Sequence, residues 1–225
     1  MLVRLRPAAP QGRDDRKLMR VRFSPPAPSM YPRVIFRYSW IYDEHWRSLP
    51  AMYWRKRRPY PSAKKIEAYA RRLEKAWRPT ESKLLREMSR VTGLPWKQER
   101  QLCYVVGRAI PFSDPLTIPV YRIARGGVDV LTHEMIHRLF SQEGNFQKIS
   151  RPWQRYAQRY RHEDPNTKIH IYLSAIHQHL LLKFFGRKRW QEEVRFARGR
   201  SAYSRTWDIV AEVGYQKILS DFSSR

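Results

Sequence analysis

The sequence predicts an α+β fold in which a few-stranded sheet packs on one central helix, followed by a mostly helical C-terminal half. Apolar residues make up 42% and aromatic residues 13% of the 225 residues, so the chain can bury a sizeable core. Segments rich in β-branched residues lie before residue 124, whereas helical periods dominate after it. Because no internal repeat is present, this pattern predicts a single domain.

Residues 1–29 differ from the rest of the chain, because they are rich in Arg and Pro and show no helical or strand period. The segment at 19–28 is similar to a translated tRNA gene, whose T-arm consensus reads Val-Arg-Phe in this frame. We therefore predict that residues 1–29 are a non-native extension and that Met30 is the true start, with a disordered basic arm as the alternative. The predicted domain spans residues 30–225.

Four elements are expected in the first part of this domain. Residues 33–42 are rich in β-branched and aromatic side chains and predict an opening strand. The prolines and the basic cluster of residues 50–61 predict a loop. Residues 62–78 have a helical period, and a second helix at residues 80–92 is expected to end at Gly93. The apolar face of the first helix is expected to hold Ile66, Tyr69, Ala70, Leu73 and Trp77.

The remaining elements are mostly helical. Residues 102–107 and 116–123 predict short strands around a loop that contains proline. Gly126 and Gly127 are expected to break the chain before a new helix. Further helices are predicted at residues 166–185, 188–198 and 202–222.

The composition excludes several classes of protein. Cys103 is the single cysteine, so the chain forms neither an internal disulfide nor a cysteine-rich zinc module. The sequence has no run of about 18 apolar residues and no secretory signal, so we expect a cytoplasmic protein without a membrane span. The net charge is +25, and it remains +20 without the seven Lys/Arg and two Asp of residues 1–29. Such a charge favours association with anionic partners.

One motif carries chemistry, the run His-Glu-Met-Ile-His from His133 to His137. Residues four apart share one face of a helix, so His133 and His137 can bind the same Zn²⁺ ion. Glu134 then lies beside the metal, where it can take a proton from a water molecule. The alternative is a pair of surface histidines on the flank of an amphipathic helix.

A zinc site in an enzyme needs a third protein ligand. His170 and His177 are seven residues apart, so they share one face of the predicted helix at 166–185, with Ser174 between them. A carboxylate is the other possibility. The candidates are Glu163, Asp164, Glu192, Glu193 and Glu212. His45 and His162 are expected at the surface.

The H-E-x-x-H motif resembles that of the zincin superfamily of zinc metallopeptidases. The resemblance implies a small zincin-like domain, in which the motif helix packs under a sheet whose edge strand aligns the substrate. The metzincin branch continues the motif with a Gly and a third His. Here Phe140 and Glu143 stand at those positions, so this sequence is not a metzincin.

A second resemblance concerns the region from about residue 100 to residue 222. The pair His170-Ile171 and the tail that begins at Trp207 are similar to an uncharacterised group of small predicted bacterial zincins. This resemblance favours His170 as the third zinc ligand. His177 is then expected to hydrogen-bond the transition state, and His177 or a carboxylate remains the alternative ligand.

We therefore predict a zinc metallopeptidase that cleaves peptide or protein substrates, with Glu134 as general base. One alternative is a zinc-dependent amide hydrolase that acts on a non-peptide substrate. The other is a nucleic-acid-binding protein with structural histidines. Basic and aromatic residues alternate at 53–60 and 151–162, where they could neutralise phosphates and stack on bases. The sequence does not predict the oligomeric state.

Overall fold

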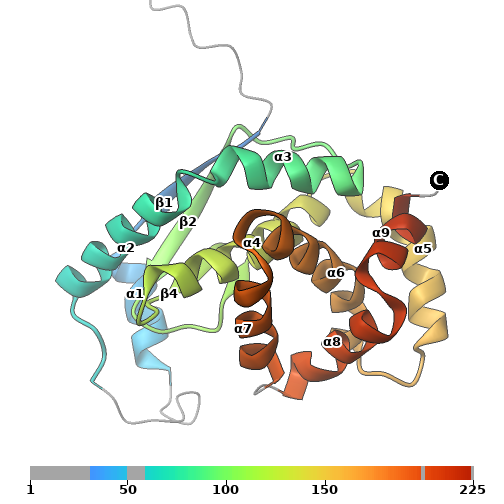
Figure 1. The fold of residues 1–225 in the computed structure, drawn as a ribbon. Coiled ribbons are helices and arrows are strands. Elements are labelled where there is room, and N and C mark those ends of the chain that lie inside the picture. Colours follow the sequence, from blue (N-terminus) through green and yellow to red (C-terminus); the bar gives the residue numbers. More distant parts are fainter. Residues whose placement is uncertain (1–30, 50–58, 199–200, 224–225) are drawn as a thin grey trace, which may run out of the picture.

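The computed structural model describes residues 31–49, 59–198 and 201–223 (Figure 1). The predicted extension at residues 1–29, the start at Met30 and most of the predicted loop at 50–61 lie outside the described residues. The described part is α+β, with one small sheet and a mostly helical C-terminal half, as the sequence predicts. None of its helices combines the length and the hydrophobicity that a membrane span requires.

The sheet has four strands in the order β1-β2-β4-β3. Strand β1 (Arg33–Arg37) pairs in parallel with β2 (Arg100–Val106), which pairs in parallel with β4 (Leu116–Pro119). Strand β3 (Phe112–Ser113) forms an antiparallel hairpin with β4. The short strand β3 therefore lies at one edge of the sheet.

The first predicted strand is wrong in its second half. It ends at Arg37, and the following residues form the helix α1 (Trp40–Ser48). The buried Asp43 explains this, because its carboxylate accepts hydrogen bonds from the backbone N–H of Gly107 and the hydroxyl of Tyr60, both at 2.7 Å. The predicted strand stops just before Asp43, whose contacts hold this part of the chain in a helix. The two later strands were predicted, but the second one ends at Pro119 instead of residue 123, and β3 was missed.

The two helices of the first half are confirmed. Helix α2 (Ala63–Trp77) buries the five apolar residues predicted for its inner face. Helix α3 (Glu81–Thr92) ends at Gly93, whose φ of 63° is the left-handed conformation that glycine adopts without a Cβ clash.

Helix α4 (Ala124–Phe140) carries the H-E-x-x-H motif and lies in the middle of the molecule, between the sheet with α2 on one side and the C-terminal helices on the other (Figure 1). The prediction of a break at Gly126 and Gly127 is wrong, because both lie inside its first turn. A Cβ at Gly127 would overlap the Tyr69 hydroxyl and lie 3.0 Å from Leu73 Cδ1. The missing side chain of Gly127 thus allows α2 to pack closely against α4, and Gly127 does not form a turn.

The C-terminal half is built around the long helix α6 (Pro165–Phe185), which α7 (Arg187–Arg198), α8 (Ser201–Val213) and α9 (Tyr215–Ser223) contact. The helix predicted at 202–222 is split at Gly214, where φ is 86°. Helix α5 (Asn145–Arg159) was not predicted, although its buried residues recur at helical spacing. These are Asn145, Ile149, Pro152 and Tyr156.

A buried carboxylate joins α3 to α6. Glu87 accepts hydrogen bonds from Arg90 at 2.6 Å, His179 Nε2 at 2.7 Å and Lys183 Nζ at 2.9 Å. The hydrogen bond from Arg90, followed by those from His179 and Lys183, holds the pKa of Glu87 well below its usual range. The charged form of Glu87 therefore stabilises the fold.

We expect Glu87→Gln to lower the free energy of unfolding at pH 7 by about 2 kcal/mol, because three charge-assisted contacts are lost. The pKa of Glu87 is lower in the folded protein than in the unfolded chain, where it is about 4.3. The charged carboxylate therefore contributes its full stabilisation above about pH 4.3, and this contribution is lost as the pH falls towards the pKa of the folded state. The difference from the wild type should therefore shrink below about pH 4. Urea unfolding across this pH range measures it. The exposed Glu67→Gln is the control, and a difference independent of pH would contradict the assignment.

Candidate metal centre

Three histidines from two helices converge on one point. His133 and His137 lie on α4, and His170 lies on α6. One ring nitrogen of each lies within 4.8 Å of the others. His137 Nε2 and His170 Nε2 are 3.2 Å apart. The structure therefore places together the three residues that the sequence names as metal ligands.

The local sequence orients His170. Asp164 caps α6 by accepting a hydrogen bond from the backbone N–H of Thr167 at 3.0 Å. One turn into the helix, His170 Nδ1 lies 2.7 Å from the carbonyl oxygen of Asn166. Because a carbonyl only accepts, Nδ1 carries the proton. The Nε2 lone pair of His170 is then left to face the cluster, which is the arrangement that fixes metal-binding imidazoles.

The three imidazoles are neutral. Burial, and then the other histidines, hold the pKa of His133 well below its usual range. Burial and the neighbouring His170 lower the pKa of His137 to about 4, and burial lowers that of His170 as well. A histidine must be neutral to bind a metal, so the cluster offers three lone pairs without first releasing protons.

The closest pair of these nitrogens has the spacing of two zinc ligands, and all three lie within 4.8 Å of one another. Tetrahedral coordination with Zn–N distances of about 2.0–2.1 Å places the ligand nitrogens roughly 3.3 Å apart. The separation of 3.2 Å between His137 Nε2 and His170 Nε2 is close to this value. A hydrogen bond between two imidazoles has a similar length, but it does not explain why the ring of His133 also lies beside this pair. The donor set is therefore one that Zn²⁺ prefers.

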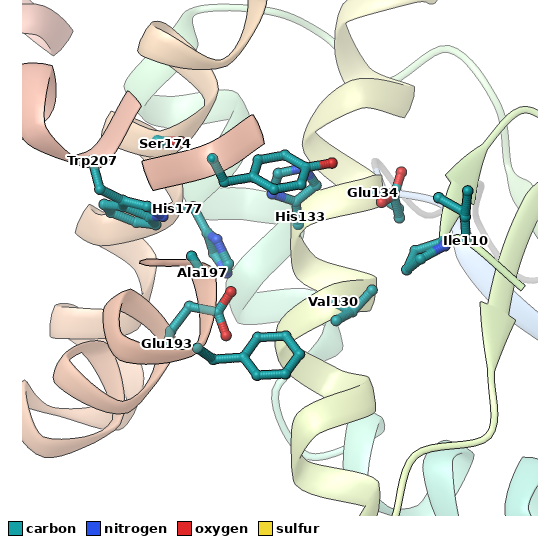
Figure 2. A pocket seen from close by; sticks show the side chains of 12 residues that line it. Ile110, Val130, His133, Glu134, Ser174, His177, Glu193, Ala197 and Trp207 are labelled. Atoms are coloured by element: carbon teal, nitrogen blue, oxygen red, sulfur yellow. The ribbon is translucent and has the colours of Figure 1, made fainter. Parts of the chain in front are cut away.

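Glu134 lies beside the cluster and is 7% exposed. Burial raises the pKa of Glu134 to about 8. A cation held by the three imidazoles acts in the opposite direction, since an opposite charge favours the carboxylate. Figure 2 shows Glu134 on the flank of α4 that faces Ile110, while His133 faces His177 and the C-terminal helices.

Together with His133 and His177, Glu134 lines a cavity, here called the first pocket (Figure 2). Its internal volume is about 100 Å³. The apolar part of its wall comes from the segment before β3 and from α4, α7 and α8. The main apolar residues are Ile110, Val130, Phe196, Ala197 and Trp207. The polar groups of the motif thus lie against an apolar wall, which strengthens electrostatic interactions there.

Two ion pairs hold α7 in place as part of this wall. Arg189 Nε donates to Asp129 Oδ1 of α4 at 2.7 Å, and Arg189 also packs on the ring of Phe185, 3.8 Å from its centroid. Arg125 of α4 donates to Glu192 of α7 at 2.6 Å. The wall therefore has a fixed position relative to the motif helix.

His177 lies next to the cluster but is not part of it. Its ring centroid is 5.6 Å from that of His133 and 6.4 Å from that of Trp207. His177 is 1% exposed, and neither ring nitrogen makes a hydrogen bond of good geometry to a described residue. Burial, followed by the charge of Arg189, lowers the pKa of His177 to about 3. His177 is thus a neutral imidazole turned into the first pocket.

Four of the five carboxylates considered as alternative ligands make other contacts. Glu163 and Glu212 both pair with Arg205, at 2.7 and 3.0 Å. Asp164 is occupied as the cap of α6, and Glu192 pairs with Arg125. Within the described residues, the metal-binding cluster contains histidines alone. Glu193 is the one of these carboxylates that lines the first pocket.

Sequence reasoning missed Tyr203. This α8 residue lies edge-on to His170 and His133, with ring centroids 5.0 and 6.0 Å apart. Nothing in its local sequence distinguishes it, because the tertiary packing of α8 on α6 brings it to the site. His45 and His162 are exposed, as predicted.

The structure describes only part of the two basic and aromatic segments that the sequence suggests for nucleic-acid binding. Residues 53–58 lie outside the described residues. In the segment 151–162, one of the three aromatic side chains is buried and the other two are half-buried. Tyr156 is 6% exposed and its hydroxyl donates to Asp221 at 2.8 Å, and Trp153 is half-buried. Tyr156 therefore packs in the fold, whereas Trp153 and Tyr160 keep part of their surface exposed, and nucleic-acid binding stays an untested prediction.

Comparison of this chain with protein-family models, with curated proteins and with solved structures finds no match. The geometry of the three-histidine cluster, Glu134 and the first pocket is therefore the basis for assigning a function.

Proposed function

We propose that the protein is a zinc-dependent hydrolase that cleaves peptide bonds. One observation carries the proposal: three neutral imidazoles from α4 and α6 converge within 4.8 Å, next to a buried glutamate at the wall of a pocket. His133, His137 and His170 would hold the zinc ion. Glu134 and His170 are buried and His133 and His137 are half-buried, and burying such polar groups is costly unless they bind something.

Each residue of the site has a chemical role in this proposal. A bound zinc ion polarises a carbonyl and lowers the pKa of a water molecule to about 7. Glu134 accepts a proton from the attacking water and passes it to the leaving amine. The neutral His177 can donate an N–H hydrogen bond to the substrate oxygen, where negative charge develops. The apolar wall excludes bulk water from these groups.

Chelation tests this proposal. Hydrolysis of a quenched-fluorescence peptide library should fall to background after dialysis against a zinc chelator such as phenanthroline. Activity should return when stoichiometric Zn²⁺ is added, because the site needs the ion but the fold retains its core. A sample dialysed without chelator is the control, and circular dichroism checks that the helices persist. Peptide hydrolysis that survives complete removal of metal would contradict the proposal.

A further inference from the structure

A second cavity, here called the second pocket, is lined by His137, which does not line the first pocket. Its internal volume is about 430 Å³. A cavity of about 150 Å³ is enough to hold benzene, so the second pocket has room for an aromatic side chain. It is the roomier of the two pockets beside the motif.

The wall of the second pocket is mostly apolar, and it holds two pairs of aromatic rings. Phe146 and Trp153 of α5 form one pair, with ring centroids 6.1 Å apart. Phe140 of α4 and Tyr172 of α6 form a stacked pair, with ring centroids 5.4 Å apart. Apart from His137, no acidic or basic side chain in the described part of the chain lines it.

Folding leaves part of this wall in water. Phe146 is 50% exposed and Ile169 is 45% exposed, although both line the pocket. Exposed apolar residues that gather in one cavity commonly mark a binding site. The pocket is therefore suited to a large apolar group rather than to a charged one.

Both pockets are lined by histidines of the metal centre and by residues of one backbone segment. His133 and Glu134 line the first pocket, and His137 lines the second. Ile110 lines the first pocket and Ser113 lines the second, so the segment 110–113 passes along both. This segment includes the edge strand β3, and an edge strand can pair with an extended chain. An occupant extended along this segment can therefore reach both pockets, which His133 and His137 line.

We propose that the second pocket is a substrate subsite for a large apolar side chain of an extended polypeptide. This side chain lies on the opposite side of the scissile bond from the side chain that enters the first pocket. The substrate is therefore a polypeptide segment with a bulky aromatic or aliphatic residue on the side of the second pocket and a smaller one in the first. The inference rests on the proposed peptidase function.

Paired peptides and a pocket variant test this subsite. A positional scan first identifies the substrate position at which the residue matters, and two peptides are then made with Phe or Ser at that position. In the wild type, kcat/KM for the Phe peptide should exceed that for the Ser peptide by at least roughly 10-fold. In Phe146→Ser, this ratio should fall close to one, because one aromatic wall is lost. Zinc content and thermal unfolding verify that the variant is folded.

Gln147→Ser is the matched control, since Gln147 follows Phe146 on α5, is exposed and does not line the second pocket. It should keep the wild-type ratio. Cleavage without a Phe preference, or a preference that Phe146→Ser leaves intact, overturns the subsite and leaves the peptidase function standing. Zinc-loaded wild type that cleaves no peptide overturns both. Hydrolysis of N-acyl amino acids in place of peptides would show that the pocket holds an acyl chain, and it overturns the polypeptide occupant.

Discussion

Glu134→Gln is expected to lower kcat for peptide hydrolysis by roughly 10²–10⁴-fold, the range by which general acid–base catalysis accelerates reactions. Glutamine has nearly the same shape as glutamate but does not accept the proton of the attacking water. The three imidazoles are untouched, so the variant should still bind a single zinc ion. Steady-state kinetics of the zinc-loaded protein measure the loss of kcat, and metal analysis of the same sample measures the bound zinc.

Glu143→Gln is the control for this variant, because Glu143 lies just after α4 and is exposed. Its activity should match that of the wild type. If Glu134→Gln retains activity within a factor of a few, Glu134 is not the general base. Loss of zinc in Glu134→Gln would instead mean that this glutamate holds the metal.

His170→Ala is expected to weaken zinc binding by more than about 100-fold. Loss of even an outer hydrogen-bond partner of a metal ligand costs about 10–100-fold in affinity, and His170 is placed as a direct ligand. Competition with a chromophoric chelator measures the affinity. His177→Ala should keep zinc affinity close to that of the wild type, since His177 lies outside the three-histidine cluster.

These two variants decide between the candidate third ligands. Weak zinc binding in His177→Ala, combined with normal binding in His170→Ala, would make His177 the ligand. Normal affinity in both variants would contradict a three-histidine site altogether.

The sequence predicts correctly those helices in which the spacing of apolar residues matches the face that is buried. Helix α2 was predicted because five apolar residues repeat at helical spacing, and the same five are buried. Helix α3 was predicted from its period and from Gly93, which adopts the left-handed conformation expected at a helix end. In both helices, burial of one face decides the structure, and one face can be read from spacing alone.

The wrong predictions arise where a residue serves tertiary packing. Gly127 suggests a break in the sequence, yet it permits the contact of α4 with Tyr69. Pro152 argues against a helix across α5, because proline lacks the N–H of a helix interior, but the structure accommodates it there. The run 33–42 predicts a strand, whereas the contacts of the adjacent Asp43 with Gly107 and Tyr60 hold the end of this run in a helix. Such contacts are between distant residues and leave no local signal.

The residues of the site also fall into two groups, those predicted from local spacing and those brought there by tertiary packing. The spacing of His133 and His137 predicts their shared face, and the structure places them together. His170 was named from the helical face that it shares with His177 and from a family resemblance, and the structure places its Nε2 3.2 Å from that of His137. Tyr203 and the second pocket were not predicted, because they depend on how α8 and α5 pack against α6 and α4.

The zinc content of the intact chain, purified without added metal, tests the central claim most directly. Elemental analysis should find a single zinc ion per chain in the wild type and none in His133→Ala. The exposed His162→Ala should match the wild type, which shows that the loss is specific to the cluster. A wild-type protein without zinc, both as purified and after incubation with a zinc salt, would contradict the metal centre and the hydrolase proposed on it.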